Sequence, residues 1–375
     1  MGGAGGADRR QAVAAGRKSG TVSDDPPQST DAVAEDKPAH ADLPSIRVIG
    51  FPGRFTAWGL DLVRQVLVLA GLAIEIIPLA QAPALGKVPV GEPGAVVRVL
   101  LAHGPMLGHA DILPDAGSRT IVFLDDPMHA LDELVGGAGE PRDAARVLTA
   151  TLAPLAPVLR EPGVLLVRRI AGMDPMAALQ AIAAHLVPTL PPVVTVANDS
   201  TPDIAETARE PSDTVRDLTG QVLTPLINLA IGGAREPMVY PLHCFYRGDR
   251  AFEPALPIVD LLGPRRVLYH GPAFYVPPGR WRVDAELYFS DDAHNAKCAL
   301  DVLAGVERVT GLELVELVTV QIRPQEGGLF LASFPVTIER PDDRIEIRVW
   351  LDRGAIEGQI GLRQITLHPD EADDS

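Results

Sequence analysis

The chain has 375 residues, of which 46% are hydrophobic and 22% charged, and its formal net charge is −16. That length and apolar content suffice for two or three domains with buried cores. The negative charge argues against nucleic acid and against anionic membrane surfaces, because both require a basic footprint on the protein. No apolar run approaches the roughly 18–20 residues of a membrane span.

The N-terminal stretch and the two cysteines bear on the location of the protein. Residues 1–44 have no hydrophobic periodicity and no apolar segment typical of a secretory signal, so we expect a disordered tail. Cys244 and Cys298 are too few for a disulfide framework. They are expected to be reduced core residues of a cytoplasmic protein.

An alternation of apolar runs and helical periods follows this tail. Five short apolar runs predict strands buried on both faces, at 46–51, 73–79, 96–103, 120–126 and 164–169. Stretches of helical period separate most of them, at 56–70, 127–135, 142–159 and 174–187. This rhythm predicts an α/β fold, a parallel sheet with helices on both faces.

The second half of the chain changes character. Residues 188–212 are rich in proline, threonine and acids and predict a linker, and 213–231 have a helical period that Pro225 should kink or interrupt. From about 237 the period becomes two, which predicts an antiparallel β-sandwich or jelly roll of roughly eight strands. The expected strands are 266–270, 273–279, 281–289, 298–305, 314–322, 330–339, 344–351 and 358–367.

These patterns divide the chain into six predicted parts. They are a tail at 1–44, an α/β domain at 45–187, a linker at 188–212, a linking helix at 213–236, a β-sandwich at 237–369 and an acidic tail at 370–375.

The loop after the first predicted strand has the setting of a phosphate site. A strand that runs into a tight loop and a helix N-terminus supplies unpaired N–H groups and a partial positive charge. The Walker spacing is absent from 46–58. The stretch 52–58 instead resembles the 5′-phosphosulfate loop of the sulfotransferases, which use the donor PAPS and often have Pro-Lys/Arg-Ser-Gly-Thr-Thr-Trp. Pro52, Thr56 and Trp58 match, whereas Gly53 stands at the basic position.

Three later stretches resemble sulfotransferase motifs in the same order, so that the resemblance covers about 46–187. His103 and Pro105 match the stretch that carries the catalytic histidine, Asp126-Pro127 matches an Arg-Asp-Pro turn, and Arg168 matches a late arginine. The resemblance implies that His103 is a general base toward a hydroxyl. It also implies a donor site at the loop, made by Gly53, Arg54, Phe55, Thr56 and Ala57.

Some residues that differ from the sulfotransferase pattern are negatively charged. Asp125 replaces the arginine and Glu133 the serine that would hold the 3′-phosphate of PAPS. Two unit charges about 4 Å apart interact by roughly 4 kcal/mol at an effective dielectric near 20, so exchanging arginine for aspartate turns attraction into repulsion. We therefore expect the donor site to be degenerate. No cofactor is assigned, and PAPS is the one that a working site would bind.

Structural roles compete with these assignments. The structural alternative for His103 is a buried or loop histidine. For Arg54 it is a solvated loop residue, and for Thr56 it is the N-cap of the following helix. Asp125 and Asp126, an acidic pair before proline, are typical of a turn or helix cap rather than of a metal site. His243, Cys244 and His270 fit no standard zinc spacing, so no metal is predicted.

Two aromatic residues of the second half fall on polar strand faces. Strict alternation places Tyr288 and Trp350 outward, where aromatic rings can stack on sugars unless another part of the chain covers them. Residues 271–289 also resemble a unit of β-sandwich domains appended to bacterial glycosyltransferases. The two rings are therefore candidates for a sugar platform.

Three hypotheses for function follow. The first is a sulfotransferase-like protein with a degenerate PAPS site, which binds or scaffolds a glycan or glycoconjugate in bacterial polysaccharide metabolism. The second is an active sulfotransferase that transfers the sulfuryl group of PAPS to a carbohydrate hydroxyl, with His103 as base. The third is a non-enzymatic module whose sandwich binds a protein partner.

Overall fold

The computed structural model describes residues 46–78, 96–103, 119–137, 139–188, 210–248, 250, 253–308 and 311–370. The predicted tail, most of the linker at 188–212 and the end of the chain lie outside these ranges. The described residues belong to one compact unit. None of the helices in the described ranges combines the length and the apolar character that a transmembrane segment requires.

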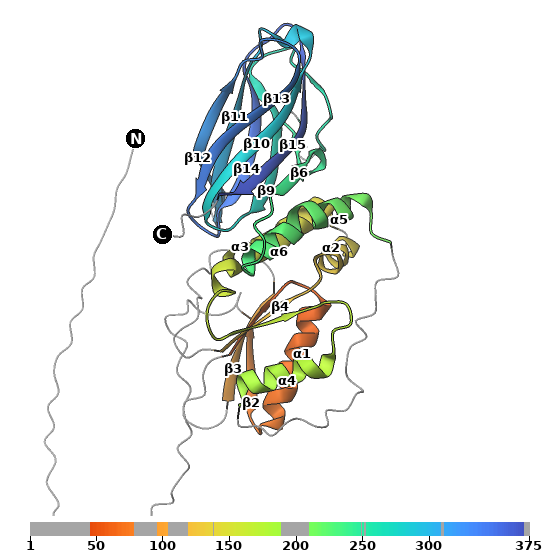
Figure 1. Ribbon diagram of the computed structural model, residues 1–375, viewed down its shortest axis with the longest axis vertical. Coiled ribbons are helices and arrows are strands. Elements are labelled where there is room, and N and C mark those ends of the chain that lie inside the picture. The colour runs from red at the N-terminus through yellow and green to blue at the C-terminus, as the bar shows by residue number, and fades with distance from the viewer. Residues whose placement is uncertain are drawn as a thin grey trace, which may run out of the picture. The chain divides into compact units, whose positions relative to one another are not determined.

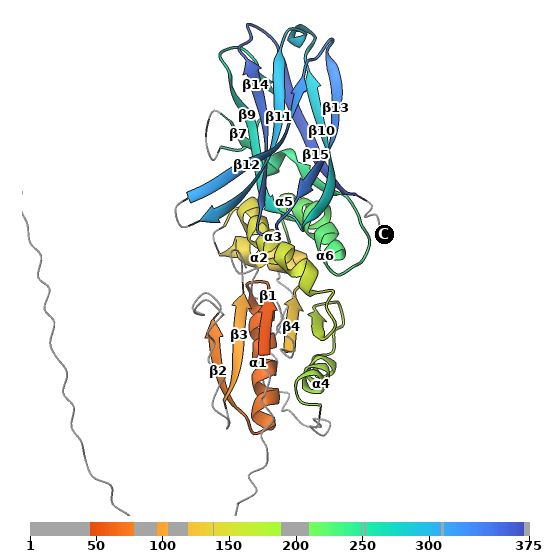
Figure 2. The same ribbon diagram turned by 90° about the vertical axis from the view of Figure 1, so that its left-hand side faces the viewer.

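The first half is an α/β arrangement around a parallel sheet, sheet A (Figures 1 and 2). Its strands are β1 (Ile46–Gly50), β2 (Ala73–Pro78), β3 (Val96–His103), β4 (Arg119–Leu124) and β5 (Val164–Arg168), in the order β2-β3-β1-β4-β5. All four neighbouring pairs are parallel. The helices are α1 (Arg54–Leu69), α2 (Pro127–Gly136), α3 (Pro141–Val158) and α4 (Pro175–Leu186).

Helices cover both faces of sheet A, which confirms the α/β prediction. On one face, Val48, Val99 and Ile121 share a hydrophobic cluster with the buried sides of α1 and α4. On the other, Ile49 and Val122 pack in a second cluster that includes α2 and α3. The central strands β1 and β4 are buried on both sides, as expected for parallel strands covered by crossover helices. The prediction of burial on both faces is wrong for the edge strands, because β2 has no fully buried residue and β5 only Val167.

The predicted linking helix is interrupted, as its proline suggested. It consists of α5 (Asp213–Leu218), a π-helical turn (Thr219–Leu223) and α6 (Thr224–Ala230), with Pro225 in the first turn of α6. Proline has no N–H to donate to the preceding turn, and the π-helical turn stands at that point. The segment packs along α3 and buries Val222 and Leu226.

The second half is a β-sandwich of two antiparallel sheets, B and C (Figure 2). Sheet B contains β13 (Gly328–Ile338), β10 (Gly279–Phe289), β15 (Gln359–Pro369) and β6 (Met238–Pro241), in that order, with β8 (Val259–Asp260) paired to β15. Sheet C contains β12 (Gly311–Ile322), β11 (Lys297–Arg308), β14 (Arg344–Arg353), β9 (Arg266–Tyr275) and β7 (Tyr246–Arg247). Short 3₁₀ turns lie at Leu242–Cys244 and Asp291–Ala293.

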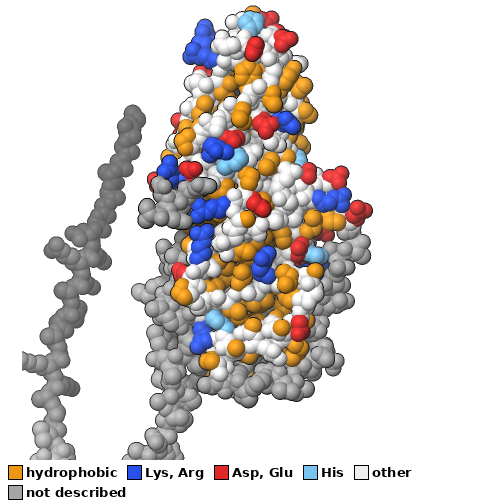
Figure 3. All heavy atoms as spheres, in the orientation of Figure 1, with side chains coloured by type: hydrophobic (Ala, Val, Ile, Leu, Met, Phe, Trp, Pro, Cys, Tyr) orange, Lys and Arg blue, Asp and Glu red, His pale blue; other side chains and the backbone are white. Residues whose placement is uncertain are grey.

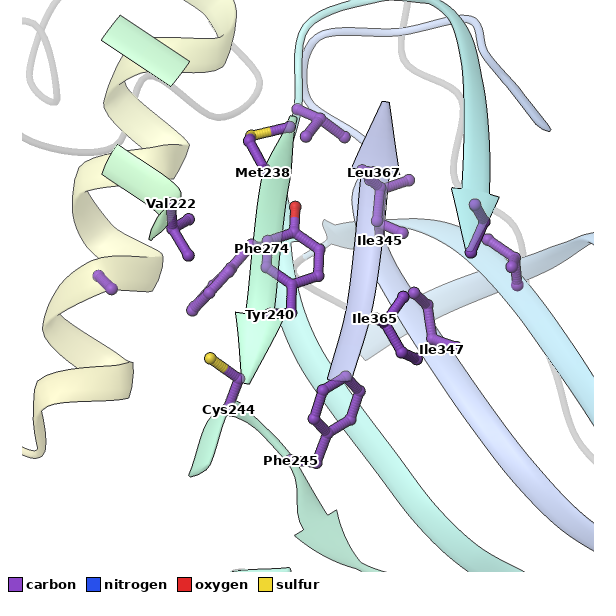
Figure 4. Packing of buried hydrophobic residues seen from close by; sticks show 14 of the residues in the cluster. Val222, Met238, Tyr240, Cys244, Phe245, Phe274, Ile345, Ile347, Ile365 and Leu367 are labelled. Atoms are coloured by element: carbon purple, nitrogen blue, oxygen red, sulfur yellow. The ribbon is translucent and has the colours of Figure 1, made fainter. Parts of the chain in front are cut away.

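One hydrophobic cluster joins the two sheets to the helices. Figure 4 shows Tyr240 and Met238 of β6 with Ile345 and Ile347 of β14, and Val222 of the π-helical turn facing the same group. All of these side chains are buried. The helical segment 213–230 is therefore part of the core beneath the sandwich.

Helix α3 also contacts the sandwich through polar groups. The Arg142 guanidinium lies 3.3 Å from the centroid of the Tyr246 ring and donates a hydrogen bond to the Phe245 carbonyl. Tyr246 in turn stacks on His270, with ring centroids 5.3 Å apart. A cation over an aromatic face is attractive, and more so when both are partly desolvated.

This stack predicts a loss of stability in mild acid. Burial is the main cause that lowers the pKa of His270; Arg348 and Arg142 lower it too, whereas Glu346 raises it. A histidine whose folded-state pKa lies below its unfolded value stabilises the fold above the unfolded pKa, near 6.5, and loses that contribution as the pH falls toward the folded value. We expect the denaturant midpoint to fall between pH 7.5 and 5.5, and the fall to be smaller in His270→Gln.

The exposed His294 provides the matched control. His294→Gln should keep the pH slope of the unmodified chain. An identical slope in the two variants would contradict the role of His270.

Candidate functional site

The loop between β1 and α1 lies where open α/β sheets bind ligands. Strand β1 is central in sheet A. The connection through α1 leads from β1 to β2 on one side of it, whereas the chain after β3 crosses to β4 on the other side of β1. The carboxyl end of β1 is thus a topological switch point. Gly50 is in register with His103 at the end of β3, so the backbone of the predicted base adjoins the loop. The His103 side chain lies outside the described part of the structure.

Two side chains of the predicted donor site point into the protein. Phe55 is 1% exposed; its ring stacks on Trp58 at 5.2 Å and meets Phe123 edge-on at 6.1 Å. The Thr56 hydroxyl donates a 2.6 Å hydrogen bond to the Phe51 carbonyl. Thr56 is not the N-cap, since the cap position of α1 is Gly53 and has no side-chain hydrogen bond. These two side chains therefore hold the loop onto the helix.

A carboxylate of the chain itself occupies the start of α1. Both oxygens of Glu133 accept from the backbone N–H of Arg54, at 3.1 and 3.2 Å, and the Arg54 guanidinium lies 3.7 Å from the same carboxylate. Gly53 has φ +150°, and a β-carbon there would come within 2.9 Å of Glu133 Oε2. An anion at a helix N-terminus is stabilised by the unpaired N–H groups and the helix dipole. Here that anion is Glu133.

The neighbouring aspartates also have structural partners. Asp126 caps α2, accepting from the N–H groups of Met128 and His129, which agrees with the helix-cap interpretation. Asp125 is buried, with Arg169 Nη1 3.3 Å from its carboxylate. Burial raises the pKa of Asp125 above its usual value, although the Arg169 charge lowers it. Within the described residues, no group of three or more His, Cys, Asp or Glu side chains could hold a metal ion.

A second candidate site lies on the outer face of sheet B. The alternation of β10 buries Leu287 and Phe289 and leaves Tyr288 43% exposed. Leu329 of β13 and Gly361 of β15 are its cross-strand neighbours. Because Gly361 has no side chain, the Pro257–Ile258 segment can approach β15 closely. A β-carbon at Gly361 would lie 2.7 Å from the Pro257 carbonyl oxygen. The ring therefore stands between a backbone wall and an exposed leucine.

Ordered polar groups continue from Tyr288 along β10. Gln364 donates to Glu286 at 2.7 Å. Asp284 accepts from the Ser333 hydroxyl at 2.6 Å and lies 3.0 Å from His368 Nε2. The alternation of β10 puts Asp284 and Glu286 on the same face as Tyr288, and the strand register supplies their cross-strand partners.

Trp350 belongs to the other sheet. It lies on β14 of sheet C, opposite Ala299 and Val267, and is half-buried. The Arg265 guanidinium stands 5.6 Å from its ring centroid, and its indole Nε1 is buried. Each aromatic residue is on the outward side of its strand, but the two are in different sheets. Tyr288 and Trp350 therefore do not form one platform.

Charged and apolar side chains mix on the sandwich surface. On the face that Figure 3 shows, acidic and basic side chains lie among hydrophobic ones. The exposed large hydrophobic residues of the described part include Ile258, Leu329 and Leu331, at 48%, 58% and 64%. Leu331 lies opposite Glu286, so that apolar and polar groups alternate around Tyr288.

Comparisons with known proteins give structural likenesses only. No family model matches the chain, and no curated protein does. Among solved structures, a Family 16 Carbohydrate Binding Module-2 is similar at 15% identity, over 29% of this chain and 73% of that one, with a TM-score of 0.22.

Two further likenesses are of the same order. The carbohydrate binding module CBM6cm-2 from Cellvibrio mixtus lichenase 5A has 12% identity over 30% of this chain and 71% of that one, with a TM-score of 0.18. The K1 cleaved adhesin domain of Lys-gingipain from Porphyromonas gingivalis W83 has 10% identity over 36% and 99%, with a TM-score of 0.25. At these scores the likenesses assign no function to this chain.

Proposed function

We propose that this chain binds a glycan or glycoconjugate through the outer face of sheet B, with Tyr288 as the stacking platform. The observation that carries the proposal is the exposed Tyr288 ring beside Glu286 and Asp284, whose orientations are fixed by hydrogen bonds. Binding sites combine apolar and aromatic surface with a few well-placed polar groups. A sugar ring has both complements, C–H groups on its faces and hydroxyls at its edge.

The Pro257–Ile258 segment beside Tyr288 favours a sugar ring as the ligand, because it limits the space next to the tyrosine ring. Pro257 and Ile258 approach β15 on one side of the tyrosine and Leu329 flanks the other. A ring laid on Tyr288 would therefore be confined laterally, while its hydroxyls reach Glu286 and Gln364 along the strands. Tyrosine loses little conformational entropy on binding, because it has only two side-chain torsions.

The α/β part is proposed to be sulfotransferase-like and without a working donor site. Its central strand, loop and helix are arranged as a phosphate site requires, but Glu133 holds the Arg54 N–H and Phe55 is in the core. On this proposal it supports the glycan-binding sandwich, in polysaccharide or glycoconjugate metabolism, and contributes no sulfuryl transfer.

Tyr288→Ala tests the glycan proposal. A glycan array should identify bound sugars, and titration calorimetry should then show affinity reduced at least tenfold in Tyr288→Ala. Trp350→Ala, an aromatic change on the other sheet, should leave the affinity unchanged. Loss of binding in Trp350→Ala with retention in Tyr288→Ala would move the site to sheet C and refute the assignment.

A protein partner is the second candidate, favoured by the exposed Leu329, Leu331 and Ile258 around the same ring. Aromatic residues with apolar neighbours are typical of interface hot spots. A blank glycan array together with a pull-down partner that depends on Tyr288 and Leu331 would support this candidate instead.

A further inference from the structure

Three arginines lie on the proposed glycan face with their guanidinium groups outward. Arg280 and Arg282 precede Asp284 on the outer side of β10, and Arg363 is on β15. Their side chains are 70%, 53% and 66% exposed. The exposed charge on the outer side of these two strands is therefore largely cationic, in a protein whose net charge is −16.

The two carboxylates of this face are less exposed than the arginines and accept hydrogen bonds from neighbouring side chains. The side chains of Asp284 and Glu286 are only 17% and 23% exposed. Asp284 accepts from Ser333 and contacts His368, and Glu286 accepts from Gln364. A ligand that approaches Arg282 and Arg363 from solvent therefore meets their guanidinium groups before the carboxylates of Asp284 and Glu286.

Each arginine retains donors for a ligand. Arg282 Nε lies 3.4 Å from Asp284 and Arg363 Nη1 lies 3.3 Å from Glu286. A guanidinium has five N–H donors in a planar fork, which suits two-point binding of a carboxylate or an ester-linked oxyanion. Each ion pair involves one nitrogen of the guanidinium group, and the two side chains are more than half exposed.

A β-bulge brings Arg363 to this face. Opposite Glu286 the register of β15 shifts, because Gln364 pairs with Glu286 and Leu362 with Leu287, which leaves Arg363 as the extra residue. Bulges re-aim side chains and are frequent beside binding sites. Arg363 is exposed and lies two residues after Gly361, the cross-strand partner of Tyr288.

We propose that the ligand of this face is an acidic oligosaccharide, bearing carboxylate or sulfate groups, whose ring stacks on Tyr288 and whose anionic groups bind Arg363 and Arg282. The inference rests on the glycan-binding function proposed above. Tyr288 and Arg282 are six residues apart on β10, about 20 Å at roughly 3.3 Å per residue, so the ligand is a chain of several sugars.

The overall negative charge does not oppose this selectivity at physiological salt. The Debye length is about 8 Å at 0.15 M ionic strength, so distant acids are screened and the arginines nearest the ligand dominate. Binding of an acidic glycan should then weaken as salt rises. Binding of a neutral glycan should not.

The test compares ligands that differ only in charge. The probes are oligogalacturonate and its fully methyl-esterified form, and sulfated and unsulfated dextran oligosaccharides, titrated calorimetrically at 50 and 300 mM salt. We expect one acidic form to bind at least tenfold tighter than its neutral counterpart at 50 mM salt, with the difference reduced at 300 mM.

Variants place the selectivity on the arginines. Arg282→Gln combined with Arg363→Gln should remove the acidic preference and keep weak binding, whereas Tyr288→Ala should weaken both forms. Arg353→Gln, an exposed arginine of sheet C, is the matched control and should change nothing. Circular dichroism verifies the fold of each variant.

Each contrary result identifies which proposal fails. Equal affinity for charged and neutral forms, or tighter binding of a cationic chitosan oligomer, would overturn the acidic-ligand inference and leave glycan binding intact. An acidic preference that survives in the Arg282/Arg363 variant would place it elsewhere and also overturn the inference. Absence of binding to every sugar tested would remove the proposed function itself.

Discussion

Replacing Phe55 by alanine is expected to lower the free energy of unfolding by about 3–5 kcal/mol, the usual range for a phenylalanine removed from a packed core. The ring is 1% exposed and contacts both Trp58 and Phe123, in the cluster between sheet A and helices α1 and α4. Its removal takes apolar area from the core and leaves a cavity beneath the loop. Chemical denaturation at neutral pH measures the change.

The control for Phe55 is in the same helix. Val68 is apolar and 64% exposed, so Val68→Ala removes methyl groups from the surface of α1 and should change stability by less than about 0.5 kcal/mol. A ligand-binding Phe55 would behave differently: its alanine variant would keep its stability and lose affinity for a nucleotide. Such a result would show that Phe55 is part of the donor site and not a core residue.

Most of the fold could be predicted from the sequence because its two periods are clear. The apolar run at 46–51 became β1 (Ile46–Gly50), and the alternating run at 281–289 lies within β10 (Gly279–Phe289). The runs at 266–270 and 273–279 were predicted as separate strands, with the glycine and proline at 271–272 between them. The structure continues β9 (Arg266–Tyr275) through them, and the register shift of its pairing with β14 absorbs the irregularity.

The candidate sites were less predictable because they depend on contacts between distant residues. Alternation shows that Tyr288 and Trp350 each face outward, but only the strand order shows that they are in different sheets. Glu133 was expected near the outer phosphate of a nucleotide, yet its bond to Arg54 joins residues 79 positions apart. That contact joins the start of α1 to α2, and no local sequence pattern encodes it.

Replacing Glu133 by alanine is expected to lower the free energy of unfolding by about 1–2 kcal/mol, the usual cost of losing a helix-terminus acceptor. The variant leaves the Arg54 N–H without its present acceptor and the Arg54 guanidinium without its ion pair. The ion pair contributes little, because the arginine side chain is 83% exposed and water screens it. Most of the loss therefore comes from the backbone N–H, and thermal and chemical denaturation measure it.

Glu140 provides a matched comparison. It stands at the N-cap of α3, is exposed, and makes no side-chain hydrogen bond there. Glu140→Ala removes the same side chain from another helix start, and its stability should change by less than about 0.5 kcal/mol. Equal losses in the two variants would show that Glu133 acts through general charge and not through its bond to Arg54.

A titration with a nucleotide decides between a degenerate and a working donor site. With Glu133 on the helix terminus and Asp125 buried nearby, the unmodified chain should show no rise in melting temperature with millimolar PAP, the desulfated donor. A ligand that binds only the folded state at 100 times its dissociation constant would stabilise it by about 2.7 kcal/mol, which a thermal-shift assay detects readily. Stabilisation of the unmodified chain that disappears in Arg54→Ala would mean that Glu133 moves aside and that the loop still binds the nucleotide, which would contradict a degenerate donor site.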